Sequence, residues 1–356
     1  MLEIKSISGL TDEVWKGVLK YLGAVEHIRI LSCNEIRYLW ESEAHVNKVL
    51  ENLKILHVSK CQSLVSLGEE GVEDTFGNNF LSSLSILDVH DCLSMERCCC
   101  PNNIENLYIT GCKSVTRVSF PTTTKADVKK LQTLVLYDGN YLMENINSRS
   151  LSMLERVSIS GWTNLISINQ LNINFIHLTN LTIYDCPSIE SFPDLQLSNL
   201  THLSISKCPS MEYTFPCGRW PLKLVGLRIG GLNKPILEWG AQNFPTSLVD
   251  LMLFGEGNVS NFSKLRNLLP SSLTTLQIIE FDKLESLSEG LEHLMSLEHL
   301  AIRHCPKVMH LPKSLLPSLM SLTITKCKNL KKRCDGRGSH YWRDVSHIPR
   351  IDIRDK

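Results

Sequence analysis

The sequence of 356 residues predicts an α/β solenoid in which short parallel strands stack into one curved sheet. The prediction begins with residues 178–193, which read L-x-x-L-x-I-x-x-C-x-x-I-x-x-F-P, and residues 200–211, 297–311 and 319–330 repeat that pattern. In each copy the last two apolar residues before the cysteine are two positions apart, so they point to the same side of a strand. Such a strand can bury its apolar side only against neighbours of the same kind, as in a repeat array.

The strand recurs along the whole chain at intervals of 20 to 31 residues. This spacing is typical of leucine-rich repeats. We therefore expect a curved horseshoe of about fourteen repeats, with a parallel concave β-sheet and an irregular convex side. The predicted strand centres are Ile4, Ile30, Val58, Val89, Ile109, Leu136, Ile159, Ile183, Ile205, Ile229, Leu253, Ile278, Ile302 and Ile324.

Cysteine is common where the chain leaves each predicted strand and turns. A small side chain with a weak S–H donor suits a tight interior turn. Because equivalent positions in stacked repeats serve packing, we expect buried thiols rather than disulfides, which suits a reducing compartment. The turn cysteines are Cys33, Cys61, Cys92, Cys112, Cys186, Cys208, Cys305 and Cys327.

The array is predicted to span residues 1–330, with its first repeat truncated, and residues 331–356 are predicted to form a C-terminal cap. Residues 12–22 read as a short helix early in the array, and two long repeats carry predicted loops at 69–79 and 122–130. The cap is expected to lay its apolar residues across the last repeat. These apolar residues are Tyr341, Trp342, Val345, Ile348 and Ile351.

Composition and motifs argue against several classes of function. The formal net charge is zero, which gives no general attraction to nucleic acid. No apolar run approaches the roughly 18 residues of a membrane span. The sequence has no phosphate-binding G-x-x-x-x-G-K-[ST] loop, and Cys98-Cys99-Cys100 matches no spacing typical of a metal site. We therefore expect no enzymatic activity, no cofactor, no metal ion and no membrane span.

The concave face is the predicted binding surface, because side chains beside the strand leucines point away from the core. Tyrosine and arginine are frequent anchors of protein interfaces. The candidate partner-binding residues are Tyr108, Tyr137, Tyr184, Arg228, Phe254, Arg303, His304 and Lys326.

Two features resemble the leucine-rich-repeat region of plant coiled-coil nucleotide-binding (NLR) disease resistance proteins. They are the cysteine turns and the closing run of the chain, with N-L-K-K-R-C at 329–334 and Y-W-x-x-V-x-H-I-P-x-I at 341–351. The resemblance covers nearly the whole chain and implies a cytoplasmic recognition module. The implied partners are a pathogen effector, a host protein targeted by the effector, and the receptor's own nucleotide-binding domain. That domain has no counterpart in this sequence.

A second interpretation remains open. Cysteine-rich leucine repeats also form the substrate-recruiting arm of F-box ubiquitin ligases. Those repeats usually carry I-T-D-x-G-L after the cysteine, which Gly9-Leu10-Thr11-Asp12 echoes faintly and once.

Overall fold

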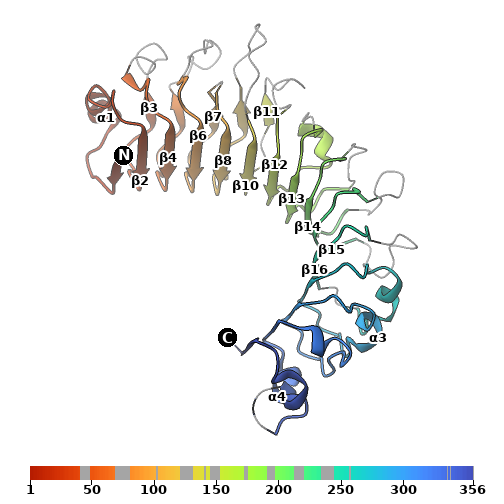
Figure 1. Cartoon of the computed structure of the whole chain (residues 1–356). Coiled ribbons are helices and arrows are strands. Elements are labelled where there is room, and N and C mark those ends of the chain that lie inside the picture. Colours follow the sequence, from red (N-terminus) through yellow and green to blue (C-terminus); the bar gives the residue numbers. More distant parts are fainter. Residues whose placement is uncertain are drawn as a thin grey trace. The chain divides into compact units, whose positions relative to one another are not determined.

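The predicted strands form a parallel sheet (Figure 1). The side chains on one face of this sheet build the core. The computed structural model describes residues 1–40, 49–68, 81–101, 103–120, 131–139, 142–144, 153–171, 175–190, 197–211, 220–233, 244–255, 258–334, 336 and 338–355. Both predicted long loops, 69–79 and 122–130, lie outside the described residues. The chain divides into two units, Met1–Ile189 (unit 1) and Glu190–Lys356 (unit 2).

The main strands of unit 1 follow one another in chain order, and each pairs in parallel with the next. In β13, Leu181 and Ile183 are fully buried, and their register partners Val157 and Ile159 in β12 are buried as well. The same alternation repeats from strand to strand, so each inward pair continues a single apolar column. These strands are β1 (Leu2–Lys5), β2 (His27–Leu31), β4 (Ile55–Ser59), β6 (Ile86–His90), β8 (Asn106–Thr110), β10 (Thr133–Tyr137), β12 (Arg156–Ser160) and β13 (Asn180–Tyr184).

Unit 1 also contains short strands that the sequence pattern did not predict. After the turn, several repeats form a second short strand, and these strands pair in parallel in two small sheets. The buried Leu39 and Leu67 show that this side of the repeat contributes to the core. The short strands are β3 (Tyr38–Trp40), β5 (Ser66–Gly68), β7 (Arg97–Cys99), β9 (Arg117–Ser119) and β11 (Leu142–Glu144).

The early helix predicted at 12–22 is present as α1 (Asp12–Leu19). Thr11 caps its amino terminus, since its hydroxyl accepts a hydrogen bond from the backbone N–H of Val14. Trp15 is buried and donates its indole N–H to the carbonyl of Leu39, 2.8 Å away. A short 3-10 helix, η2 (Ile168–Leu171), follows later in the unit.

The main strands of unit 2 have the same parallel arrangement. The inward residues Ile278, Ile302 and Ile324 are register partners on three successive strands and have no exposed surface. The strands are β14 (His202–Cys208), β15 (Gly226–Leu232), β16 (Asp250–Phe254), β17 (Thr275–Ile279), β18 (His299–Arg303), β19 (Ser321–Thr325) and β20 (Arg350–Arg354). Between them lie η5 (Ser263–Asn267), α3 (Ser288–Leu291), η6 (Leu316–Ser318), α4 (Lys328–Cys334) and α5 (Trp342–Val345).

The tail adds a strand to the sheet in addition to covering apolar surface. β20 pairs in parallel with β19, with Ile351 opposite Leu322. Tyr341, Val345 and Ile348 are buried, and the Tyr341 hydroxyl accepts a hydrogen bond from the backbone N–H of Leu311. None of the described helices is long and apolar enough to cross a membrane.

The eight turn cysteines are all buried, as predicted. Cys186 donates its S–H to the carbonyl of Tyr184, 3.5 Å away, and Cys327 donates in the same way to Thr325. These two thiols therefore close the turn onto the last residue of their own strands. Where cysteine is replaced, Trp162 and Phe281 are buried at the same position.

Candidate functional site: the exposed face of the sheet

The candidate site is the face of the main sheet that points away from the core. In β13, Asn180 and Thr182 are half-buried and Tyr184 is exposed, while the two residues between them are buried. The outward residues at the first, third and fifth positions of the five-residue strands form three rows, which we call the first, middle and third rows. Because the strands are paired in register, side chains in one row lie about 4.8 Å apart.

In unit 1 the structure places the three predicted tyrosines on this face, in two different rows. Tyr108 lies in the middle row of β8, and Tyr137 and Tyr184 lie in the third row. The hydroxyls of Tyr137 and Ser158 share a hydrogen bond of 2.8 Å. Tyr184 is 37% exposed, the most accessible of the three.

The same face also carries separate polar pairs between neighbouring strands, which were not predicted from the sequence. His57 Nδ1 lies 2.8 Å from Asp88 Oδ2 on the next strand, and His90 Nδ1 lies 2.6 Å from the hydroxyl of Thr110. Arg29 and Glu3 form a further cross-strand pair at 3.1 Å. Aligning the middle positions of successive repeats would have revealed two of these pairs, because their members are direct register partners.

In unit 2 the predicted residues fall into two groups. Arg228 is exposed in the middle row of β15, while Phe254 and Arg303 are half-buried in the third row. His304 and Lys326 are exposed in the turns just after β18 and β19, with φ values of 52° and 54°. Both turn residues adopt the left-handed conformation that directs the next residue, cysteine, inward.

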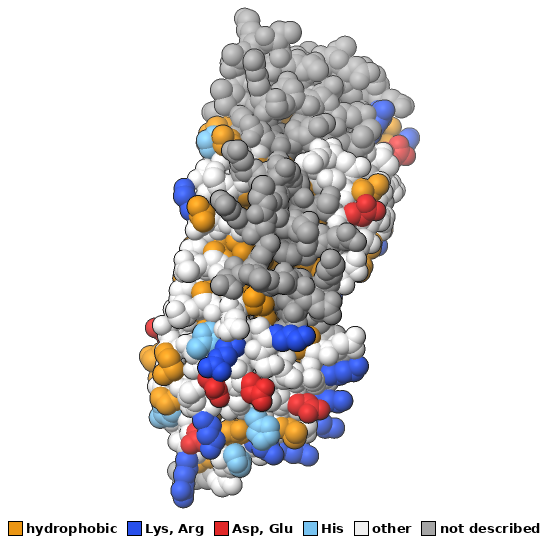
Figure 2. All heavy atoms as spheres, turned by 90° about the vertical axis from the view of Figure 1, so that its right-hand side faces the viewer, with side chains coloured by type: hydrophobic (Ala, Val, Ile, Leu, Met, Phe, Trp, Pro, Cys, Tyr) orange, Lys and Arg blue, Asp and Glu red, His pale blue; other side chains and the backbone are white. Residues whose placement is uncertain are grey.

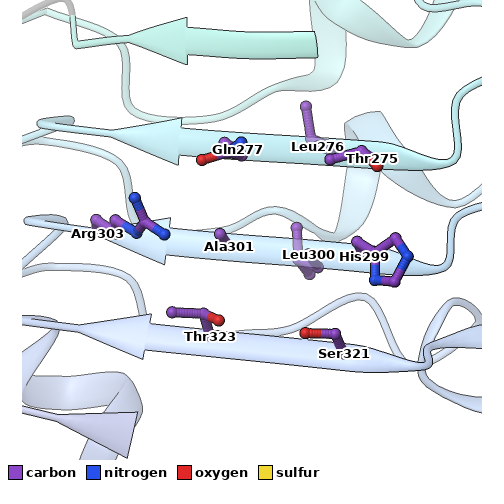
Figure 3. Close-up of a pocket in the computed structure, with 9 residues that line it drawn as sticks. All are labelled: Thr275, Leu276, Gln277, His299, Leu300, Ala301, Arg303, Ser321 and Thr323. Atoms are coloured by element: carbon purple, nitrogen blue, oxygen red, sulfur yellow. The ribbon is translucent and has the colours of Figure 1, made fainter. Parts of the chain in front are cut away.

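The exposed face of unit 2 contains a hollow of about 200 Å³ over β17, β18 and β19 (Figure 3). At its floor lies Ala301, whose register partners in the middle row are Gln277 and Thr323. Because alanine ends at Cβ, the row is interrupted there. Thr275, Leu276, Gln277, His299, Leu300, Ala301, Arg303, Ser321 and Thr323 line the hollow.

Only one residue of this lining, Arg303, was singled out by the sequence. Figure 3 shows it at one end of the hollow and His299 at the other, with Ala301 between them. The sequence does contain a pattern that predicts the hollow, because a small residue in a row of longer ones leaves a gap. This pattern becomes visible only when the middle-row residues of successive repeats are aligned.

The cysteine-rich segment at 98–100 belongs to the interior. Cys98, Cys99 and Cys100 are buried. Among the described residues, no group of three or more His, Cys, Asp or Glu side chains is arranged to hold a metal ion. On the face of unit 2 seen in Figure 2, below the grey residues, acidic and basic side chains are interspersed.

Comparison with curated proteins finds a relative in sequence. The chain is 27% identical over 345 residues to a candidate disease resistance protein of Arabidopsis thaliana. The match covers 87% of this chain and 24% of the relative, so the chain spans about a quarter of the relative's length. No protein-family model matches the sequence.

Among solved structures, TLR13 in its complex with ssRNA13 aligns with 99% of this chain and 61% of its own chain, at 14% identity and a TM-score of 0.41. The repeat pattern and the stacked parallel strands themselves identify the fold. The chain is a leucine-rich-repeat solenoid that resembles a plant disease resistance protein in sequence.

Proposed function

We propose that this chain is the protein-recognition module of an intracellular plant immune receptor and acts in the cytoplasm. The observation that carries the proposal is the similarity to the Arabidopsis protein across most of the chain. The ligand would be a pathogen effector or a host protein that the effector modifies. In a full-length receptor the module would also contact a nucleotide-binding domain.

The exposed sheet face is the surface on which we expect the partner to bind. It offers half-exposed aromatic and arginine side chains, which are frequent anchors of protein interfaces, on hydrogen-bonded strands. Tyr108, Tyr184, Phe254 and Arg303 are all at least partly accessible there. A binding role of this kind needs no catalytic group.

The first test separates this proposal from the ubiquitin-ligase interpretation. Sequencing the transcript and the genomic region upstream of the codon for Met1 should reveal a phosphate-binding loop of the G-x-x-x-x-G-K-[ST] type. An F-box at that place would reject the immune-receptor proposal. The similarity to a disease resistance protein favours the first outcome.

The second test concerns the surface. The full chain, tagged and expressed in leaves with and without pathogen, is used to capture partners, which are quantified by mass spectrometry. A variant with Tyr108, Arg228, Phe254 and Arg303 replaced by alanine should lose at least about tenfold of a specific partner, since each true anchor contributes about 1–2 kcal/mol or more. The matched control replaces the exposed Tyr21, Leu222 and Met295, which lie off the sheet face.

The control variant should capture the partner as the wild type does, and both variants should melt normally. Unchanged capture by the four-residue variant would exclude the exposed face as the binding surface.

A further inference from the structure

The hollow at Ala301 is small for a metabolite and large enough for a side chain. Its volume of about 200 Å³ corresponds to roughly six or seven water molecules at about 30 Å³ each. Small-molecule sites usually measure about 300–1,000 Å³ and enclose their ligand. This hollow lies on an exposed sheet, so we consider a side chain presented by a partner as its occupant.

The lining favours a negatively charged group. It contains an arginine, a histidine, a glutamine amide and hydroxyls, and none of its residues is acidic. The guanidinium of Arg303 presents several N–H donors in a planar fork that matches a carboxylate. The Gln277 amide and the Thr323 hydroxyl lie on the two flanking strands and can also donate.

The carboxylates nearest the hollow lie outside its lining. Asp250, in the first row of β16, is the register partner of the lining residue Thr275. Glu298 Oε2 lies 3.9 Å from Nε2 of His299, at the end of the hollow opposite Arg303. Asp352 forms an ion pair with Arg354. Glu280 is exposed in the turn after β17. Within the described residues, the half-buried Arg303 side chain forms no hydrogen bond or ion pair.

An apolar surface adjoins the arginine in the same row. Ile279 is the register partner of Arg303, and Phe254 is the register partner of Ile279. Both are half-buried. With strands about 4.8 Å apart, these side chains lie about 5 and 10 Å from Arg303 along the row.

We propose that the hollow receives the aspartate or glutamate side chain of a protein partner, with Arg303 as its counter-ion and Ile279 and Phe254 as the seat of a neighbouring apolar residue. In an extended partner segment that rises about 3.3 Å per residue, the apolar residue would stand two or three positions from the acid. This inference rests on the proposed recognition function and specifies the ligand of that surface.

The test uses a display library of eight-residue peptides, acetylated and amidated so that no terminal charge contributes. One central position is fixed as Glu, Gln or Lys, and the other positions are randomised. Selection against the purified full chain should enrich peptides with central Glu. The best of these should bind at least about tenfold more tightly than their Gln isosteres at 50 mM salt and lose much of that preference at 500 mM.

Two variants and one control locate the effect. Arg303→Gln should bring the Glu and Gln peptides to within about twofold of each other, and Ala301→Leu should weaken the Glu peptides by filling the floor. Arg354→Gln, in the same row two strands away, should keep the preference because Arg354 already faces Asp352. All three should melt within about 2 °C of the wild type.

Several results would overturn the proposal. They are a library that yields no Glu enrichment, a preference that survives Arg303→Gln, and unchanged affinity in Ala301→Leu. Displacement of the peptides by inorganic phosphate or an RNA octamer at similar concentrations would also reject it, because the hollow would then be a general anion site. If selected peptides have uncharged centres yet lose binding in Phe254→Ala, the recognition surface stands and only the carboxylate assignment fails.

Discussion

At the scale of single residues, the turn cysteine is an interior group whose S–H donates to a backbone carbonyl of its own repeat. Cys186 has no exposed surface, and its S–H is directed to the carbonyl of Tyr184. Burial raises the pKa of the Cys186 thiol, because the thiolate would lose its hydration. The buried turn therefore favours the neutral thiol of Cys186 over the thiolate.

This environment predicts different outcomes for two replacements of Cys186. Cys186→Ala removes one sulfur and a weak hydrogen bond and should cost about 1 kcal/mol. Cys186→Asp places a carboxylate in the same buried turn and should cost several kcal/mol. Urea denaturation of both variants measures the difference, and equal midpoints would show that the turn is not desolvated.

The residue before the cysteine explains why some predicted site residues lie off the strands. His304 and Lys326 occupy left-handed positions, and Asp91, Gly111 and Asp185 do the same in other repeats. Glycine, asparagine and aspartate are the residues that adopt this conformation most readily. The Gly and Asp residues before several cysteines could have predicted a left-handed turn. The Lys and His residues at the same position in other repeats give no such indication.

At the scale of one strand, the two faces have separate tasks, and adjacent residues of β18 test this. Ile302 has no exposed surface, whereas Arg303 is half-buried on the outer face. Ile302→Ala should destabilise the chain by about 2–5 kcal/mol through lost burial and a cavity. Arg303→Ala should change stability by no more than about 0.5 kcal/mol.

Denaturation midpoints of the two variants provide the measurement, with circular dichroism to confirm the fold. If Arg303→Ala lost as much stability as Ile302→Ala, Arg303 would be a structural residue of the sheet, and its role could not be recognition alone.

The strands were predictable from sequence because burial repeats with a period of two within each strand. Leu181 and Ile183 carry that signal, and a slip of one residue would expose both. The short strands such as β7 were not predictable, because three residues give no period and their pairing depends on neighbouring repeats. The hollow escaped notice for a related reason, since it results from one small residue, Ala301, among register partners far apart in sequence.

At the scale of the whole molecule, a repeat array couples each repeat mainly to its neighbours. Distant repeats can then lose structure at different denaturant concentrations. The chain has a reporter for this in each unit, because Cys33 in unit 1 and Cys305 in unit 2 are fully buried thiols. Alkylation requires an accessible thiolate, so each thiol should react only when its own region opens.

Pulse alkylation across a urea series, read by mass spectrometry, should therefore give separate transitions for Cys33 and Cys305. Ile30→Ala, in the strand before Cys33, should lower the Cys33 midpoint by roughly 1–2 M, given a loss of about 2–5 kcal/mol and a typical urea dependence of about 1–3 kcal/mol per molar. The Cys305 midpoint should move by less than half as much. Ile302→Ala provides the reciprocal control and should act mainly on Cys305. If both substitutions shift both thiols equally, the array unfolds as one cooperative unit, and changes on one part of the exposed face could not be interpreted independently of the rest.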